Sequence, residues 1–575
     1  MTQPPQQGGY GGPPTPPRPP LPPVLPPPPA GYGGPCGQPG LQPGPQSGPY
    51  GQPQDPYDYD WNSGYGAQQA PPPSHPPLAG PGGAGGGGRR PKGWWAVAVA
   101  AVVAIALIIG GGVLYADSGD EAAKNDTAGV GGGTGKAVGE GDNPTSRGSE
   151  KVPANPAARV LFQVPSPKAG GAGGGAVPGS WLTGKAYVKT GVAEITGYDP
   201  DKGTESWTIP LPGPVCAVTD HTTEDGLTAI VHESAMPTKA KPTHGCTQVS
   251  AIDLDAGRKL WTGSALRGRQ PIRFDNVTIS AHTVAAGGAA GGAAFDIASG
   301  ASLWTPKASD TCYDAGYGGG AKLVAVRKCR TSGGLQLHIQ TIDPATGKVI
   351  SAYRMADGVE QVGIVSTDPL VVAANAGGSA GGGSADGGSG ISEYFSLDNR
   401  TGKLRTRISA PAERYTAVCD VLRGIERCTQ SAVGKDRLYL PTKAHDGGGG
   451  SGQTNEIVAF DLTTGRQTGQ RTAAGEGYVI VPLRMDGGNL LAYKRSPSAA
   501  RSGRVVSIDG VTFEQTALLE NPATQAVREA EAGLPPERAE YLYAQGRLYI
   551  SAVRASGSAS PAAKEYLVIA FGTGA

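Results

Sequence analysis

Charged and aromatic side chains are scarce in this sequence of 575 residues. Only 17% of the residues are charged, 6% are aromatic, and the formal net charge is +1. The chain lacks the excess of one sign that binding of nucleic acid would require, so we predict no nucleic-acid partner. Glycine and proline are abundant instead, with 93 and 52 residues. Together they exceed a quarter of the chain, about twice the usual share, which indicates long stretches outside a packed core.

The sequence also lacks the motifs of common enzymes and metal sites. It contains no HExxH, Walker or kinase motif, and no CxxC pair. The seven histidines are scattered, and Glu233, next to His232, has no partner with which to form a catalytic dyad. We therefore predict a protein that is not an enzyme, with no catalytic residue, metal ligand or cofactor.

Residues 1–88 are dominated by proline and glycine and contain few branched aliphatic or charged residues. Such a segment buries too little apolar surface to offset its ordering entropy. The composition predicts a disordered tail.

Residues 94–116 form an uncharged apolar run. As a helix they would reach roughly 34 Å at about 1.5 Å per residue, enough for the hydrocarbon core of a bilayer. Basic residues (Arg89, Arg90, Lys92) precede the run and acidic residues (Asp117, Asp120, Glu121) follow it. The positive-inside rule then predicts one transmembrane helix, a cytoplasmic tail and an extracytoplasmic remainder. A cleaved signal peptide is the alternative, but the run is long and about 90 residues precede it.

Residues 117–156 are small, polar and rich in glycine, which predicts a flexible stalk. The region that follows, 157–575, contains a recurring pattern: an apolar strand, an Asp, a short turn ending in Gly, and a second strand. The copies lie roughly 43 to 63 residues apart, the size of a four-stranded propeller blade. The clear copies are centred on Asp199, Asp253, Asp296, Asp343, Asp398 and Asp461, and weaker ones lie at Asp509 and the C-terminus.

Each residue type in the pattern has a structural reason. Asp opens a turn by accepting hydrogen bonds from nearby backbone amides, and Gly supplies the positive φ of the return. Trp207, Trp261 and Trp304 fall at one offset in three copies, where a large ring would pack between adjacent sheets. We interpret the aspartates as turn residues and the tryptophans as packing residues.

The series resembles a known repeat. Ala251, Asp253, Gly257 and Trp261 fit the form A-x-D-x-x-T-G-x-x-x-W, apart from Ala256 at the Thr position. This form is similar to the repeat of the pyrroloquinoline-quinone-like (PQQ-like) β-propellers, and the resemblance covers roughly residues 158–575. The layout also resembles actinobacterial membrane proteins that carry such a domain after a Pro/Gly-rich tail and one span. The resemblance implies an all-β propeller.

Eight hairpins predict eight blades, with seven as the alternative if the Asp509 copy is irregular. The last hairpin lacks a following strand, whereas residues 158–165 form an isolated apolar strand. We predict that this strand completes the last blade and closes the ring, which removes exposed sheet edges. A short helix is expected within 526–544.

Six of the seven cysteines lie after residue 200: Cys216, Cys246, Cys312, Cys329, Cys419 and Cys428. An even set confined to an extracytoplasmic region predicts disulfides, although reduced core cysteines are the alternative. Sequential pairing is the simplest of fifteen connectivities.

Three functions are compatible with a propeller, because fold alone does not determine function. The first is a non-enzymatic scaffold or sensor that binds a protein or a cell-envelope component on the propeller face. The second is a quinoprotein dehydrogenase, which the resemblance associates with a tryptophan floor, adjacent paired cysteines and Ca²⁺. The sequence has no adjacent cysteine pair. The third is hydrolysis or another catalysis on the propeller, for which the sequence contains no HExxH, Walker or kinase motif. The scaffold is therefore the expected function.

Overall fold

A computed structural model of the chain describes residues 149–167, 175–375, 391–419, 424–447, 452–555 and 565–574. The predicted tail and membrane span, and the predicted stalk up to residue 148, lie outside the described residues. None of the helices in the described part is long and apolar enough to cross a bilayer.

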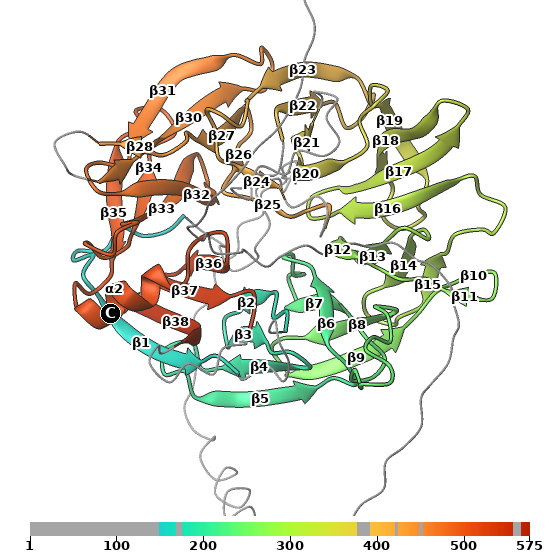
Figure 1. Cartoon of the computed structure of the whole chain (residues 1–575), viewed down its shortest axis with the longest axis horizontal. Coiled ribbons are helices and arrows are strands. Elements are labelled where there is room, and N and C mark those ends of the chain that lie inside the picture. The colour runs from blue at the N-terminus through green and yellow to red at the C-terminus, as the bar shows by residue number, and fades with distance from the viewer. Residues whose placement is uncertain are drawn as a thin grey trace, which may run out of the picture. The chain divides into compact units, whose positions relative to one another are not determined.

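Eight antiparallel sheets of four strands surround a common centre (Figure 1). This ring confirms the predicted all-β propeller with eight blades. Blade 1 contains β2 (Ser180–Leu182), β3 (Tyr187–Thr190), β4 (Glu194–Tyr198) and β5 (Glu205–Pro210). Blade 2 contains β6 (Val215–Val218), β7 (Leu227–His232), β8 (Gln248–Asp253) and β9 (Arg258–Gly263). Blade 3 contains β12 (Asn276–Ser280), β13 (Thr283–Gly287), β14 (Ala293–Asp296) and β15 (Ser302–Trp304).

The next blades repeat this order, with the first strand nearest the centre. Blade 4 contains β16 (Cys312–Gly318), β17 (Leu323–Thr331), β18 (Gly334–Ile342) and β19 (Val349–Arg354). Blade 5 contains β20 (Val362–Thr367), β21 (Leu370–Ala374), β22 (Glu393–Leu397) and β23 (Leu404–Ser409). Blade 6 contains β26 (Ala432–Val433), β27 (Arg437–Pro441), β30 (Glu456–Asp461) and β31 (Gln467–Ala473). Blade 7 contains β32 (Val479–Asp486), β33 (Asn489–Arg495), β34 (Arg504–Ile508) and β35 (Gln515–Glu520).

Blade 8 joins the two ends of the propeller. Its strands are β36 (Ala539–Ala544), β37 (Arg547–Ala552), β38 (Tyr566–Thr573) and the early strand β1 (Ala158–Pro165). β1 pairs antiparallel with β38, with Val160 opposite Phe571 and Phe162 opposite Ala570. The predicted closing strand is therefore confirmed, and the ring holds its last blade through residues more than 400 positions apart in the sequence.

Smaller elements connect the blades. A helix, α2 (Gln525–Ala532), precedes β36, and its N-cap residue Thr524 accepts a hydrogen bond from the Val527 amide. The helix begins one residue before the segment 526–544 where one was expected, and residues 539–544 of that segment form β36. Three two-stranded sheets lie outside the blades: β10 (Leu266–Arg267) with β11 (Gln270–Pro271), β24 (Val418–Cys419) with β25 (Cys428–Thr429), and β28 (His445–Asp446) with β29 (Gln453–Thr454).

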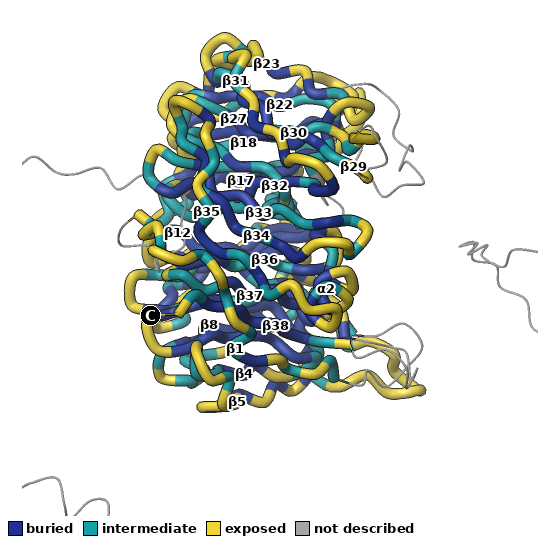
Figure 2. The backbone as a smooth tube through the Cα atoms, turned by 90° about the vertical axis from the view of Figure 1, so that its left-hand side faces the viewer, coloured by how far each residue is buried: buried dark blue, intermediate teal, exposed yellow. Residues whose placement is uncertain are grey.

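Apolar side chains are buried between neighbouring blades. Every residue of β13 and β21 is buried, as expected for middle strands covered on both faces. Figure 2 shows buried stretches within the strands and exposed ones at the loops. The hydrophobic clusters each span adjacent blades, so the ring is stabilised by a series of interfaces between blades.

The repeat turns form one side of these interfaces. Each repeat-turn aspartate, including Asp509, accepts a hydrogen bond from the backbone amide two to three residues later. The residue four positions after each aspartate has φ between 61° and 72°. This residue is glycine in six copies and Phe513 in the copy at Asp509. We call the face of the ring that carries these turns the turn face.

The tryptophans pack onto these turns. The Trp207 ring lies against Gly257 of the next blade so closely that an added Cβ would overlap it, and Trp261 lies against Gly300 in the same way. Trp304 makes a tight contact with Gly347, where an added Cβ would lie 3.0 Å from the ring. At the seam between blades 8 and 1, the Phe162 ring of β1 takes this position over Gly203. The closing strand therefore reproduces the contact that the repeats make elsewhere.

Candidate functional site

A cavity of about 440 Å³ lies among the inner strands of the ring. Its walls include residues of β2, β6 and β12 on one side and of β32 and β36 on the other. The lining is mixed: it includes large side chains such as Leu483, Tyr541 and Leu542 as well as the small residues Ser180, Ala217 and Ala539. The remaining wall comes from the segment 424–431, which follows blade 5. We call this cavity the central cavity.

Residues 424–431 are fixed in place by apolar packing. Ile425 is 8% exposed and belongs to the hydrophobic cluster between blades 4 and 5. Its carbonyl accepts a hydrogen bond from the Ile364 amide (2.7 Å), and its side chain fills the space beside Gly316, where an added Cβ would lie 2.7 Å from it. The segment therefore contributes to the core as well as to the cavity wall.

Polar contacts attach the same segment to other blades. Glu426 Oε1 accepts a hydrogen bond from the Gly319 amide of blade 4 (2.6 Å). It also lies 3.1 Å from His221 Nε2 in the turn after β6. The disulfide between Cys419 and Cys428 joins β24 to β25 at the base of the segment. Contacts to blades 2, 4 and 5 thus hold residues 424–431 across the inside of the ring.

Carboxylates outnumber cations in the lining of the central cavity. The acidic lining residues are Asp220, Asp275, Glu426, Glu537 and Glu540, whereas the basic ones are Arg427 and Arg484. The surroundings of Asp220 raise its pKa to about 6, mainly by desolvation and then by the negative charge of Glu540. The Asp220 side chain is exposed to the cavity rather than packed in the core. Its pKa is raised because the protein atoms around this confined space displace much of the water that would solvate the carboxylate. The cavity therefore favours cationic groups of a ligand.

A partly buried ion pair lies at the rim of the cavity, between the first and last blades. Lys189 of β3 is fully buried, and its Nζ lies 3.1 Å from Glu540 Oε2 of β36. Lys189 Nζ also donates to the Val177 carbonyl (2.8 Å), and the Gly179 amide donates to Glu540 Oε1 (2.6 Å). Burial lowers the pKa of Lys189, which Glu540 partly offsets. The pair orients the carboxylate at the edge of the cavity.

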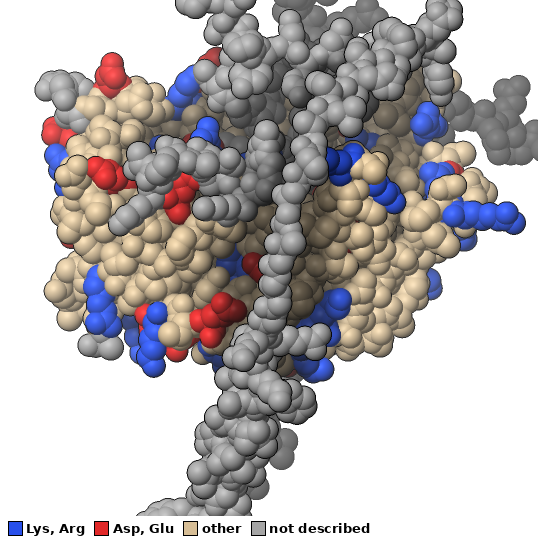
Figure 3. Space-filling view, turned by 60° about the horizontal axis from the view of Figure 1, so that its bottom comes forward, with Lys and Arg blue, Asp and Glu red and all other residues tan. Residues whose placement is uncertain are grey.

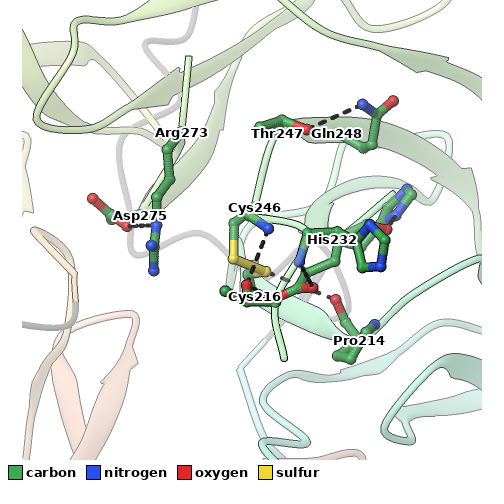
Figure 4. Close-up of a disulfide and its surroundings, with 12 residues drawn as sticks. Pro214, Cys216, His232, Cys246, Thr247, Gln248, Arg273 and Asp275 are labelled. Atoms are coloured by element: carbon green, nitrogen blue, oxygen red, sulfur yellow. Dashed lines mark hydrogen bonds and ion pairs between the residues drawn. A yellow bond between two sulfur atoms is a disulfide. The ribbon is translucent and has the colours of Figure 1, made fainter. Parts of the chain in front are cut away.

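The six cysteines of the propeller form three disulfides with sequential pairing. Cys312 and Cys329 lie opposite each other on β16 and β17. Cys216 of β6 is bonded to Cys246 in the loop before β8, and Figure 4 shows this bond near His232 and Pro214. His232 Nδ1 is 2.8 Å from the Glu233 carbonyl oxygen and its Nε2 is 3.0 Å from Ser250 Oγ. Both ring nitrogens of His232 are engaged in hydrogen bonds, so His232 and the neighbouring Glu233 form no reactive pair.

The residues singled out in the sequence do not converge on the central cavity. The aspartates of the repeat lie in turns at the edge of the ring, and Cys428 alone among the paired cysteines lines the cavity. In the described ranges, no three His, Cys, Asp or Glu side chains are placed to hold a metal ion together. Sequence reasoning missed Lys189, Glu540 and Glu426, because no local pattern marks contacts between residues that are far apart in the sequence.

Similarity to known proteins covers part of the chain. Residues 149–312 match the family described as outer membrane protein assembly factor BamB. No curated protein matches the sequence. Among solved structures, BamB from Moraxella catarrhalis shares 14% identity with a TM-score of 0.39, covering 72% of this chain and 98% of that one. Quinohemoprotein alcohol dehydrogenase from Comamonas testosteroni shares 12% identity with a TM-score of 0.40, covering 75% and 80%. Over residues 149–312 the chain is therefore similar to the BamB family, which agrees with the resemblance of its repeats.

Proposed function

We propose that this chain is a single-pass membrane protein whose propeller lies outside the membrane and acts there as a non-enzymatic binding or scaffold module. The apolar run at 94–116 and the basic residues before it support the anchor and its orientation. Three disulfides within the propeller are consistent with an oxidising compartment. The partner is a protein or a cell-envelope component.

The observation that carries the binding role is the pre-formed central cavity. At about 440 Å³ it falls in the range of ligand sites, and strands of five blades together with residues 424–431 hold its walls. Rigid walls reduce the entropic cost of binding. The acidic lining suits a protruding loop of a partner that carries Lys or Arg. Similarity over residues 149–312 to an outer membrane protein assembly factor also favours binding to proteins.

The tryptophans of the propeller favour binding over quinone chemistry. Trp207, Trp261 and Trp304 are committed to the contacts between blades described above. Trp181 is fully buried, and its Nε1 donates to the Thr219 carbonyl (2.9 Å). These four are the tryptophans of the described residues, so none of them is placed as a floor for a quinone in the central cavity.

Site-specific photo-crosslinking in intact cells tests the proposal. A photoreactive residue at Glu537, which lines the cavity and is exposed, should capture one reproducible partner. The same residue at Lys259, on the outer strand β9, is the matched control and should not capture it. Equal capture from both positions would contradict a binding role for the cavity. Quinone-dependent dye reduction by the purified protein would support the dehydrogenase alternative instead.

A further inference from the structure

A second cavity, of about 410 Å³, opens on the turn face beside blade 5. Residues from the hairpins of blades 4, 5 and 6 line it, and none of them lines the central cavity. Its charged lining residues are Lys322, Asp368, Asp398, Arg400, Arg405 and Lys435. We call it the blade-5 pocket. It is separate from the site on which the proposed function rests.

Three of the four cations in the blade-5 pocket have no partner within the part of the chain that the structure describes. Arg405 Nη2 donates to Asp398 Oδ2 (2.8 Å), so this pair neutralises itself. By contrast, the side chains of Lys322, Arg400 and Lys435 make no hydrogen bond or ion pair in that part of the chain. Asp368 is the one remaining carboxylate of the lining, which leaves the pocket with a net positive charge.

The floor of the pocket is rigid, because Asn399 ties blades 4 and 5 together. Asn399 Oδ1 accepts a hydrogen bond from Thr341 Oγ1 of blade 4 (2.9 Å), and its Nδ2 donates to the Thr367 carbonyl of blade 5 (2.9 Å). Its own carbonyl accepts from Ser351 Oγ (2.7 Å). These hydrogen bonds hold the turn that carries Arg400 against blade 4 and against Thr367 of blade 5. The Lys322 amide donates to Thr367 Oγ1 (3.3 Å), which ties the hairpin of Lys322 to the same point.

We propose that the blade-5 pocket binds a ligand through a phosphate group, with Lys322, Arg400 and Lys435 as its anchors. The three cations come from three successive blades, so they approach a ligand from different directions. A phosphate monoester has three terminal oxygens and a charge of about −1.5 to −2 at neutral pH, which can engage all three. A carboxylate offers two oxygens in one plane and a single charge. The volume of the pocket leaves room for the group that carries the phosphate.

Calorimetric titration of the full-length protein in detergent tests this site. The probes are inorganic pyrophosphate and a short-chain phosphatidic acid, which separate a free phosphorylated solute from a lipid headgroup. The test variant combines Lys322→Ala, Arg400→Ala and Lys435→Ala. It should weaken binding of at least one probe by about tenfold or more, since each hydrogen bond to a charged group contributes about that factor.

The matched control combines Lys202→Ala, Lys348→Ala and Arg466→Ala. These three residues are exposed and lie in the repeat turns of the same face. Like the test variant, the control replaces two lysines and one arginine, so it removes the same charge. The control should bind like the unsubstituted protein, and both variants should keep its melting temperature. Equal weakening by the two variants, or no binding of either probe by the unsubstituted protein, would overturn the proposal. The formal net charge of the chain is only +1, so a general cationic field is a poor alternative. Figure 3 shows charged residues scattered over the face in view rather than gathered into one patch of a single sign.

Discussion

The fully buried Lys189 in the first blade and the partly exposed Glu540 in the last form an ion pair, with 3.1 Å between Nζ and Oε2. The two residues are 351 positions apart in the sequence. The pair therefore connects the two blades that close the ring, and it also fixes the carboxylate of Glu540 in the lining of the central cavity.

Removing the carboxylate should destabilise the ring. We expect Glu540→Ala to lower the free energy of unfolding by about 3 kcal/mol or more, because the buried ammonium of Lys189 loses its counter-charge. Urea unfolding with the disulfides intact is the measurement. The control is Asp255→Ala, whose partner Lys185 is 72% exposed and should contribute less than about 1 kcal/mol. A similar decrease in the free energy of unfolding in the two variants would show that the ion pair between blades 8 and 1 contributes no more to stability than an exposed one.

The contact between tryptophan and glycine can be tested with a matched pair of glycines. Gly257 and Gly268 have almost the same φ, 61° and 65°. An added Cβ at Gly257 would overlap the Trp207 ring, whereas nothing lies within 4 Å of one at Gly268. Gly268→Ala should cost about 1 kcal/mol for the backbone alone. Gly257→Ala should cost at least about 1 kcal/mol more through overpacking, as measured by urea unfolding. Equal costs would contradict close packing between blades.

Acid should weaken the propeller through its repeat turns. Hydrogen bonds from turn amides and hydroxyls hold the pKa values of Asp296, Asp343, Asp461 and Asp509 below the ordinary value. For Asp398, Arg405 is the largest cause of the same shift. An Asp whose pKa is lowered in the folded state stabilises the fold at pH values above its unfolded pKa of about 3.9. This stabilisation is lost as the pH falls below that value. The melting temperature should therefore fall between about pH 5 and pH 3, and Asp461→Asn should reduce that fall. A melting temperature that rises over this interval would contradict the assignment.

Asp220 should show the opposite pH dependence. Its folded-state pKa of about 6 exceeds the unfolded value of about 3.9, so the folded protein keeps the proton longer. The contribution of Asp220 to stability then decreases as pH rises from about 4 to 6. Asp220→Asn should stabilise the protein at pH 7, by less than about 1 kcal/mol after solvent screening, and should have little effect at pH 4. A destabilising effect at pH 7 would show that the carboxylate has a favourable partner.

Local patterns in the sequence predicted most of the fold. In six copies, an Asp followed four residues later by a Gly, between an apolar strand and a second strand, forms a hairpin turn. The repeat therefore identified the blades, and the unpaired strand at 158–165 identified the closure. The Asp509 copy shows the limit of the pattern, because Phe513 adopts a φ of 61° at the position of the glycine. Turn geometry there is imposed by the flanking strands rather than by the residue type.

The candidate site could not be predicted in the same way. Ile425 enters a core formed by blades 4 and 5, and Glu426 reaches the Gly319 amide and the His221 ring, yet nothing in residues 424–431 marks them as part of the cavity wall. Such contacts depend on the curvature of the closed ring. The functional residues of a propeller come from many blades, and their sequence separation conceals them.

Labelling of intact cells with a membrane-impermeant maleimide tests the orientation on which the proposed function rests. Three disulfides use six of the seven cysteines, which leaves Cys36 in the predicted cytoplasmic tail. Val511, on the turn between β34 and β35, is 79% exposed and accepts a new thiol as Val511→Cys. We predict that this introduced thiol is labelled in intact cells and that Cys36 is labelled only after permeabilisation. Labelling of Cys36 in intact cells, with the introduced thiol protected, would contradict an extracytoplasmic propeller and the binding role assigned to it.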